Sequence, residues 1–320
     1  NITATCIVQD RRPGKTATWY YGTGEYRGNS ANLQGDGIFK STDNGMTWEA
    51  LASTVSGTPQ TQDAFDVIWR VVVDPSRMDK DIVYAAVIGG IYRSEDGGNT
   101  WQQVLGNNNQ DRQAAYTDLA ITDQGVLYAT MSGWPTSGSS AQVNGIYRST
   151  DGLNWTNITP SGLTGRFARV VPAIAPSDNR FVYFLADMTS TNSGISTALY
   201  HYTYVSGDGS GSGGIWSNRS ANVPTGEDFL NGFNSQGSYN MAIRVSPVDP
   251  NLVCIGGTNI YISTNGFTSD IQTNWIGGYN PNYNYSFEGW IDMMYPDHHS
   301  DIHDIAFLPS NRSEERRVGK

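Results

Sequence analysis

The chain has 320 residues and a formal net charge of −10. A protein that holds a phosphate backbone normally presents positive charge, at least in a patch, and here Lys and Arg cluster only in the last few residues, which argues against a nucleic-acid partner. No apolar stretch approaches the ~20 residues needed to cross a bilayer. With 36 Gly, 18 Tyr and 9 Trp but only 16% charged residues, the composition favours many short strands joined by tight turns.

The chain begins with the strand-like run ITATCIVQD and soon reaches the first copy of a turn motif, GIFKSTDNGMTW (37–48). Further copies are GIYRSEDGGNTW (90–101), GIYRSTDGLNW (145–155) and NIYISTNG (259–266). Their serines are 53, 55 and 114 residues apart. Because the last spacing is twice 57, a degenerate copy is expected near residue 206, where Ser206 and Asp208 stand in register. A period of this length indicates one repeat architecture.

Each repeat also carries an apolar run that ends near a proline and is followed by a short apolar strand. The prolines are Pro75, Pro176 and Pro247, and Pro309 ends a fourth such run. Proline suits a turn after a strand because it needs no ladder partner. One repeat therefore predicts four antiparallel strands, which is a propeller blade. We expect an all-β, five-bladed β-propeller with the start of a truncated sixth blade, the blades lying at about 1–52, 66–105, 114–160, 166–222 and 238–277 and the sixth starting near 299.

The last residues do not fit this pattern. Residues 310–320 read SNRSEERRVGK, where the repeat predicts an apolar strand. We interpret residues 1–309 as one propeller and 310–320 as a non-native or truncation-derived tail, within a longer multidomain chain. Cys6 and Cys254 lie in apolar strand contexts of different repeats and are expected to be buried thiols.

The turn motif itself is predicted to be structural. Ser and Asp side chains accept hydrogen bonds from backbone N–H groups in a tight turn, Gly supplies a positive φ, and Trp buries a large ring between blades. The fourth copy has an amide in place of the acid, which still accepts a hydrogen bond. The motif residues are Ser41, Asp43, Gly45, Trp48, Ser94, Asp96, Gly98, Trp101, Ser149, Asp151, Trp155, Ser263 and Asn265.

Four S-x-[DN] turns at blade spacing resemble the Asp-box (BNR) repeats of sialidases, xyloglucanase-type glycoside hydrolases and sortilin-type propellers. The segments WYYGTGEYRGNSA, FNSQGSYNMAI and YPDHHSDIHDIAFLPSN are also similar to large exported Bacteroidetes proteins, which often carry a type IX secretion sorting domain. The resemblance covers about 1–311 and implies a bacterial protein that is secreted or held at the cell surface. It specifies no activity: GRFARVVP (165–172) is not the F/Y-R-I-P segment of sialidases, and xyloglucanase-type enzymes pair two acids across two propellers.

Ligands are expected on the face where two kinds of loop meet the central channel: those that join one blade to the next, and those between the second and third strands of a blade. The richest of these loops is 275–299, with seven aromatic residues among Asn and Gly. Such flat rings could stack on sugars or peptide segments, or the loop could fill the channel by its own packing. The candidate ligand-binding residues are Tyr283, Tyr285, Trp290, Tyr295 and Asp297.

Three of the four histidines follow within residues 298–303. On a strand, His299, Asp301 and His303 would point to one face. Two imidazoles and a carboxylate could bind a divalent metal, form a hydrogen-bonded network or contact a ligand directly. Glycoside hydrolysis is usually catalysed by a pair of carboxylates. The candidate catalytic carboxylates on the loop face of the propeller are Asp301, Asp66 and Glu25. Further polar groups on the same face are Tyr26, Arg27, Asp63, Asp111, Arg112, Arg166 and Arg169.

Three functions are consistent with these features. The first is a propeller that binds a glycan or a protein segment through its loop face without catalysis. The second is a sialidase- or xyloglucanase-like glycoside hydrolase acting on extracellular polysaccharide. The third is a structural scaffold in a larger exported protein. No nucleotide-binding loop, zinc-protease motif or nucleophile elbow is present in the sequence. No cofactor is required by any of the three, a divalent metal being the one candidate.

Overall fold

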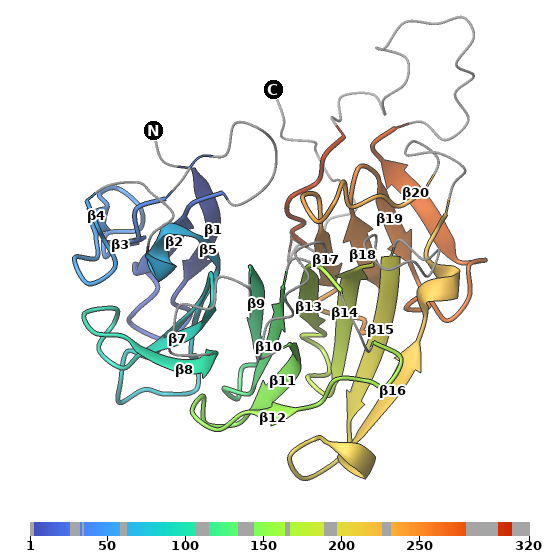
Figure 1. Ribbon diagram of the computed structural model, residues 1–320, viewed down its shortest axis with the longest axis horizontal. Helices are drawn as coiled ribbons and strands as arrows, with labels where there is room; N and C mark the ends of the chain where they lie inside the picture. Colours follow the sequence, from blue (N-terminus) through green and yellow to red (C-terminus); the bar gives the residue numbers. More distant parts are fainter. Residues whose placement is uncertain are drawn as a thin grey trace, which may run out of the picture.

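Five four-stranded antiparallel sheets account for nearly all the regular structure (Figure 1). The structure is a computed structural model, and it describes residues 3–25, 33, 35–57, 63–106, 115–133, 144–163, 167–188, 197–225, 232–279 and 300–308. The only helical elements within these ranges are three 3-10 turns: η1 (Ala64–Asp66), η2 (Gly211–Gly213) and η3 (Ser220–Asn222). The predicted all-β class is confirmed.

Each sheet is one blade, numbered I to V, and its strands pair in chain order. Blade I contains β1 (Ala4–Gln9), β2 (Trp19–Thr23), β3 (Ile38–Ser41) and β4 (Glu49–Ala50). Blade II contains β5 (Ile68–Val73), β6 (Val83–Val87), β7 (Gly90–Ser94) and β8 (Gln102–Gly106). Blade III contains β9 (Tyr116–Ile121), β10 (Leu127–Ser132), β11 (Gly145–Ser149) and β12 (Thr156–Asn157). Blade IV contains β13 (Val170–Ile174), β14 (Phe181–Asp187), β15 (Thr197–Tyr204) and β16 (Gly214–Asn218), and blade V contains β17 (Ala242–Val245), β18 (Val253–Gly256), β19 (Ile260–Ser263) and β20 (Thr273–Gly277).

The first strand of each blade is an inner strand, and consecutive inner strands pack against one another from β1 through β5, β9 and β13 to β17. Figure 1 shows the blades following one another in sequence order from the blue to the orange end of the chain. This is a five-bladed β-propeller, as predicted. Residues 300–308 carry no strand, although the Ile302 N–H donates to the Gly257 carbonyl of blade V at 2.8 Å. A sixth blade stays a prediction.

The core lies between neighbouring blades, and strand alternation explains why. Successive side chains of a strand point to opposite faces. In β5, Val71 accordingly packs toward blade I and Val72 toward blade III. In β13, Val170 packs toward blade III and Val171 toward blade V. Both faces of a middle blade are therefore apolar, which explains the apolar runs seen in the sequence.

The Ser-x-Asp turns join the last two strands of blades I, II and III. In blade I, Ser41 Oγ donates to Asp43 Oδ1 at 2.7 Å and accepts the Gly45 N–H at 2.9 Å, while Thr47 N donates to Asp43 Oδ1 at 2.9 Å. Blade II repeats this pattern. In blade V the amide of Asn265 accepts from Ser263 Oγ at 2.8 Å. The degenerate turn of blade IV differs, because Asp208 accepts from Ser210 instead.

These turns also contact the preceding blade through a tyrosine of its second strand. The Tyr20 hydroxyl of blade I donates to the Gly97 carbonyl in the turn of blade II at 3.3 Å. Between blades II and III, Gly152 lies against Tyr84, and a Cβ added to Gly152 would be 1.9 Å from the Tyr84 hydroxyl oxygen. The turn therefore holds its own strands and packs on its neighbour.

Candidate binding site at the loop mouth

A cavity of about 290 Å³ opens at the amino-terminal ends of the inner strands, and we call it the loop mouth. Its residues come from blades I, II, IV and V and from the segment after blade V. They are Thr3, Ala4, Thr5, Gly24, Glu25, Trp69, Arg169, Ser238, Tyr239 and His303. Three residues singled out in the sequence, Glu25, Arg169 and His303, thus meet at one cavity, although 278 positions separate the first from the last.

Glu25, Tyr239 and His303 form the polar centre of the loop mouth. Glu25 lies close enough to the Tyr239 hydroxyl for its carboxylate to influence the titration of the phenol. Burial first, then the neighbouring Glu25 carboxylate and the charge of Asp301, raise the pKa of Tyr239 above its ordinary value. The His303 ring meets the Tyr239 ring edge-on, with centroids 4.7 Å apart. A carboxylate, a phenol and an imidazole therefore face one space.

The surroundings of the His303 imidazole favour its neutral form. Partial burial lowers the pKa of His303, and the positive charge of Arg169 lowers it further, while Asp301 and Glu25 act in the opposite direction. Neutral imidazole can donate or accept a hydrogen bond according to its tautomer. His303 can consequently contact a hydroxyl group in either role.

Trp69 and Arg169 form another part of the wall of the loop mouth. The Arg169 guanidinium lies over the Trp69 ring, 4.8 Å from the centroid, and Trp69 Nε1 donates to the Ala115 carbonyl at 2.9 Å. Ser238, which accepts the Arg169 N–H at 3.4 Å, donates in turn to the buried carboxylate of Asp187 at 2.7 Å. These contacts fix the wall residues before any ligand arrives.

Gly24 explains how Glu25 reaches the cavity. Its φ is +97°, and an added Cβ would be 1.9 Å from the backbone oxygen of Asp66. Only glycine fits this close approach. The Glu25 N–H then donates to the Leu33 carbonyl at 2.7 Å. The end of β2 is thereby pressed against blade II, with Glu25 at the edge of the channel.

The other carboxylates named from the sequence occupy different surroundings. Asp66 is fully buried in η1, where its side chain accepts the Asp63 N–H at 3.0 Å. Asp301 has φ +78° and accepts from Asn240 Nδ2 at 2.8 Å, close enough to Tyr239 and His303 to influence both electrostatically. Glu25 and Asp301 are therefore the carboxylates near the polar centre.

An ionic layer separates the loop mouth from the rest of the channel. Arg70 of β5 binds Asp118 of β9 through Nε and Nη2, at 2.9 and 3.3 Å, and Arg169 Nη2 lies 3.8 Å from the same carboxylate. Asp118 has no exposed surface. We did not anticipate this layer from the sequence. The sequence carries one signal of this layer: Arg70 and Asp118 are charged residues within strands that are otherwise largely apolar.

The ligand-binding residues predicted in the 275–299 loop lie outside the described residues, as does His299; they are Tyr283, Tyr285, Trp290, Tyr295 and Asp297. Among the residues that the structure does describe, no group of three or more His, Cys, Asp or Glu side chains could hold a metal ion. The proposed His299–Asp301–His303 metal site is thus untested. In the same ranges no helix is long and apolar enough to cross a membrane.

No protein-family model matches the chain. A probable oligoxyloglucan-reducing end-specific xyloglucanase of Neosartorya fischeri is 27% identical over 141 residues, which is 39% of this chain and 17% of the relative. The corresponding xyloglucanase of Emericella nidulans is 29% identical over 140 residues, with the same coverage. The match spans about a sixth of the length of these curated relatives.

Solved structures show the same fold. A GH74 enzyme of Niastella koreensis matches with a TM-score of 0.53 and 17% identity over 85% of this chain and 46% of that one. A GH74 xyloglucanase of Xanthomonas campestris has a TM-score of 0.51 and 19% identity, and covers 84% of this chain and 38% of its own. An ancestral GH74 enzyme has a TM-score of 0.54 and 17% identity, over 92% and 38%. The chain thus resembles part of larger glycoside hydrolase propellers.

Proposed function

We propose that this propeller binds a neutral glycan at the loop mouth. The observation that carries the proposal is the convergence of Glu25, Tyr239 and His303 on one cavity beside the Trp69 wall. Proteins bind sugars through hydrogen bonds from planar side-chain groups, such as carboxylate, phenol and imidazole, to the sugar hydroxyls. Aromatic ring faces add to this by packing on the C–H groups of the sugar. The similarity to xyloglucanases makes a xyloglucan oligosaccharide the first ligand to test.

Isothermal titration of the purified chain with xyloglucan oligosaccharides tests the binding. We expect the wild type to bind, and Tyr239→Ala and Glu25→Gln to weaken binding about tenfold or more, since each removes a hydrogen bond in a partly desolvated site. Asp123→Asn, at the opposite end of the channel, is the matched control and should bind as the wild type does. If the wild type binds neither these nor other neutral oligosaccharides, or if the control loses as much affinity as Glu25→Gln, the proposal is wrong.

Hydrolysis is the second candidate, and the position of Glu25 beside the Tyr239 hydroxyl at the loop mouth favours it. A tyrosine hydroxyl whose proton passes to a carboxylate can act as a nucleophile, and paired carboxylates are the usual machinery of glycoside hydrolysis. Since the pKa of Tyr239 is raised, its oxygen would attack the anomeric carbon only as Glu25 removes the proton. The glycosidic bond would break in that step and the departing sugar oxygen would take up a proton from solvent, and water would then cleave the tyrosine–sugar bond, restoring the Tyr239 hydroxyl and the Glu25 carboxylate. Release of reducing ends from xyloglucan, abolished in both Glu25→Gln and Tyr239→Phe, would support this mechanism. A wild-type rate in Glu25→Gln would exclude it.

We further propose that residues 1–309 act as one propeller inside a longer exported protein, secreted or at the cell surface. Support comes from the Asp-box-like turns and from the larger size of the matched xyloglucanases. In that setting the scaffold role and the glycan-binding role are compatible. Detection of the protein in culture medium or on intact cells, by antibody labelling, tests the location. Confinement to the cytoplasm would contradict it.

A further inference from the structure

The other end of the channel has a second cavity with different chemistry. It has a volume of about 300 Å³ and is lined by the carboxyl-terminal ends of all five inner strands. We call it the turn mouth. The ionic layer of Arg70 and Asp118 lies between it and the loop mouth. A ligand at one mouth therefore does not occupy the other.

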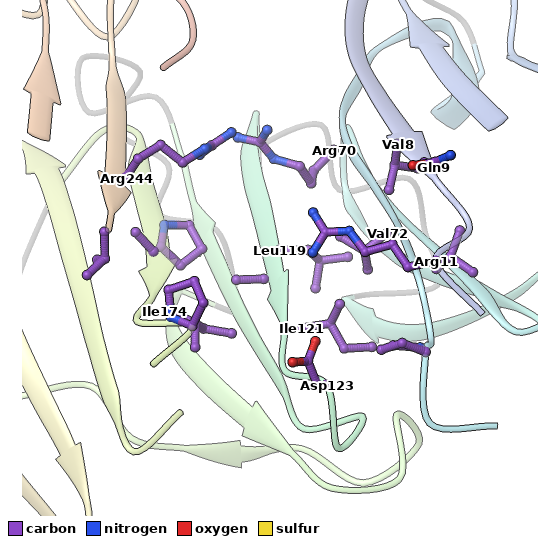
Figure 2. A pocket seen from close by; sticks show the side chains of 17 residues that line it. Val8, Gln9, Arg11, Arg70, Val72, Leu119, Ile121, Asp123, Ile174 and Arg244 are labelled. Atoms are coloured by element: carbon purple, nitrogen blue, oxygen red, sulfur yellow. The ribbon is translucent and has the colours of Figure 1, made fainter. Parts of the chain in front are cut away.

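Three arginines reach into the turn mouth. Figure 2 shows Arg70 of β5 and Arg244 of β17 extending toward each other across the cavity, and Arg11 entering from the turn after β1. Burial lowers the pKa of Arg244, and the charge of Arg70 lowers it further. Two guanidinium groups that face each other in partly buried surroundings repel one another unless an anion lies between them.

The carboxylates of this chain balance these charges incompletely. Asp118 serves both Arg70 and Arg169, and Asp304 accepts from Arg244 Nη2 at 2.7 Å but is 67% exposed. Arg11 forms no ion pair with any described residue. With Asp123 on the rim, three carboxylates are present, those of Asp118, Asp123 and Asp304. They balance four guanidinium groups, those of Arg11, Arg70 and Arg244 and that of Arg169, which shares Asp118 from the loop mouth. This excess of positive charge occurs in a protein whose net charge is −10.

Donor groups are also left over. Arg70 uses Nε and Nη2 on Asp118, and its Nη1 makes no hydrogen bond within the described residues. Arg244 uses Nη1 on its neighbouring carbonyl and Nη2 on Asp304. A planar acceptor with two oxygens can take bonds from both side chains at once, which is the geometry that guanidinium groups favour.

The remaining wall is apolar. Figure 2 shows the arginines among the side chains of Val8, Val72, Leu119, Ile121 and Ile174. Pro172 also lines the cavity. A fully hydrated inorganic anion gains nothing from such a wall, whereas an anion with an apolar group removes that surface from water. The volume is at the small end of ligand sites, which fits a molecule of this kind.

We propose that the turn mouth binds a small organic carboxylate. Its two oxygens lie between Arg70 and Arg244, and its apolar part contacts Val72, Ile121 and Ile174. Arg11 adds charge at the rim. The same chemistry can come from a free acid or from the terminal carboxylate of a peptide. This site is separate from the proposed glycan site and does not depend on it.

Titration calorimetry with benzoate, and with benzamide as the uncharged analogue, tests the site. We expect benzoate to bind the intact chain, benzamide to bind at least about tenfold more weakly, and Arg244→Gln to lose about tenfold or more of the benzoate affinity. Arg11→Gln changes only an exposed turn residue, so it keeps the test valid if Arg244→Gln does not fold, and it should weaken binding several-fold. Arg180→Gln, on an exposed turn of the same end of the molecule, should have no effect.

Further titrations identify the source and test the class of ligand. A peptide that ends in a phenylalanine carboxylate, compared with the same peptide as its amide, shows whether a protein terminus binds as well as the free acid. Preference for benzoate over benzamide, or for the peptide carboxylate over the peptide amide, supports the site. Equal affinity for acetate, inorganic phosphate and benzoate would overturn the role of the apolar wall. Absence of benzoate binding, or binding unchanged in both Arg244→Gln and Arg11→Gln, would overturn the proposal itself.

Discussion

At the scale of single residues, the buried Asp118 carboxylate is the group on which the channel most depends. Two arginines share it, and Arg70 in particular is held by charge and by hydrogen bonds. Removing one partner of a buried ion pair leaves an uncompensated charge and costs about 3–5 kcal/mol. We expect Asp118→Ala to lose stability of that order in urea unfolding. Asp304→Ala breaks an exposed pair and should cost at most about 1 kcal/mol. Equal losses would contradict this ranking.

A second residue-scale prediction concerns Gly152, which meets Tyr84 of the preceding blade. Its φ is +70°, and a Cβ would lie 1.9 Å from the Tyr84 hydroxyl oxygen. Gly152→Ala therefore combines backbone strain with overpacking, each costing about 1–3 kcal/mol. Gly57→Ala is the matched control, since Gly57 has φ +79° with nothing within 4 Å of the added Cβ, so it shows the backbone cost alone. If thermal unfolding shows the two variants to be alike, the contact with Tyr84 is not tight.

At the scale of elements, the Ser-x-Asp turn of blade I should make the stability of the folded protein depend on pH in the acidic range. Hydrogen bonds from Thr47, then from Ser41, lower the pKa of Asp43 from 3.8 to about 2. A carboxylate whose pKa is lower in the folded state stabilises the fold above about pH 4 and loses that contribution as pH falls toward 2. Asp43→Asn should therefore melt closer to the wild type at pH 2 than at pH 5.

The turn of blade V gives the reciprocal experiment. Asn265 occupies the equivalent position and accepts from Ser263 Oγ at 2.8 Å. Asn265→Asp should introduce the acid dependence that Asp43→Asn removes, and thermal melts between pH 5 and pH 2 measure both. The pH dependence staying the same in both variants would show that these carboxylates do not titrate with folding.

The elements also show what could be predicted from the sequence. Strand order follows from the repeat, because a turn motif and a proline recur at fixed spacing and each blade is a local unit. The ionic layer does not follow, since Arg70 and Asp118 lie 48 residues apart and meet only when two blades pack. Glu25 of blade I and Tyr239, which precedes the first strand of blade V, likewise meet only at the assembled loop mouth. The sequence predicts Glu25 and His303 as candidates, whereas the place of Tyr239 beside them follows only from the assembled channel.

At the scale of the whole molecule, each blade contacts its sequence neighbours, so stability should vary along the chain as in other repeat proteins. The inner strands of blades II and III are mostly buried, whereas β1 shows exposed or half-buried residues throughout. Local opening is easier where fewer apolar contacts must be broken. Blade I is therefore expected to open at a lower free energy than blades II and III.

Hydrogen–deuterium exchange of the chain at neutral pH measures this difference directly. Amides of Ala4–Gln9 should exchange faster than those of Ile68–Val73 and Tyr116–Ile121, although all three strands are hydrogen-bonded in four-stranded sheets. The reason is tertiary, because Ile7 is 62% exposed while Ile68 has no exposed surface. Ile68→Ala removes packing between blades I and II, so it should accelerate amide exchange in β5 more than in β9. The difference in exchange rate between β1 and β5 should therefore become smaller. Equal protection of β1 and β9 in the wild type would instead mean that the five blades open as one cooperative unit.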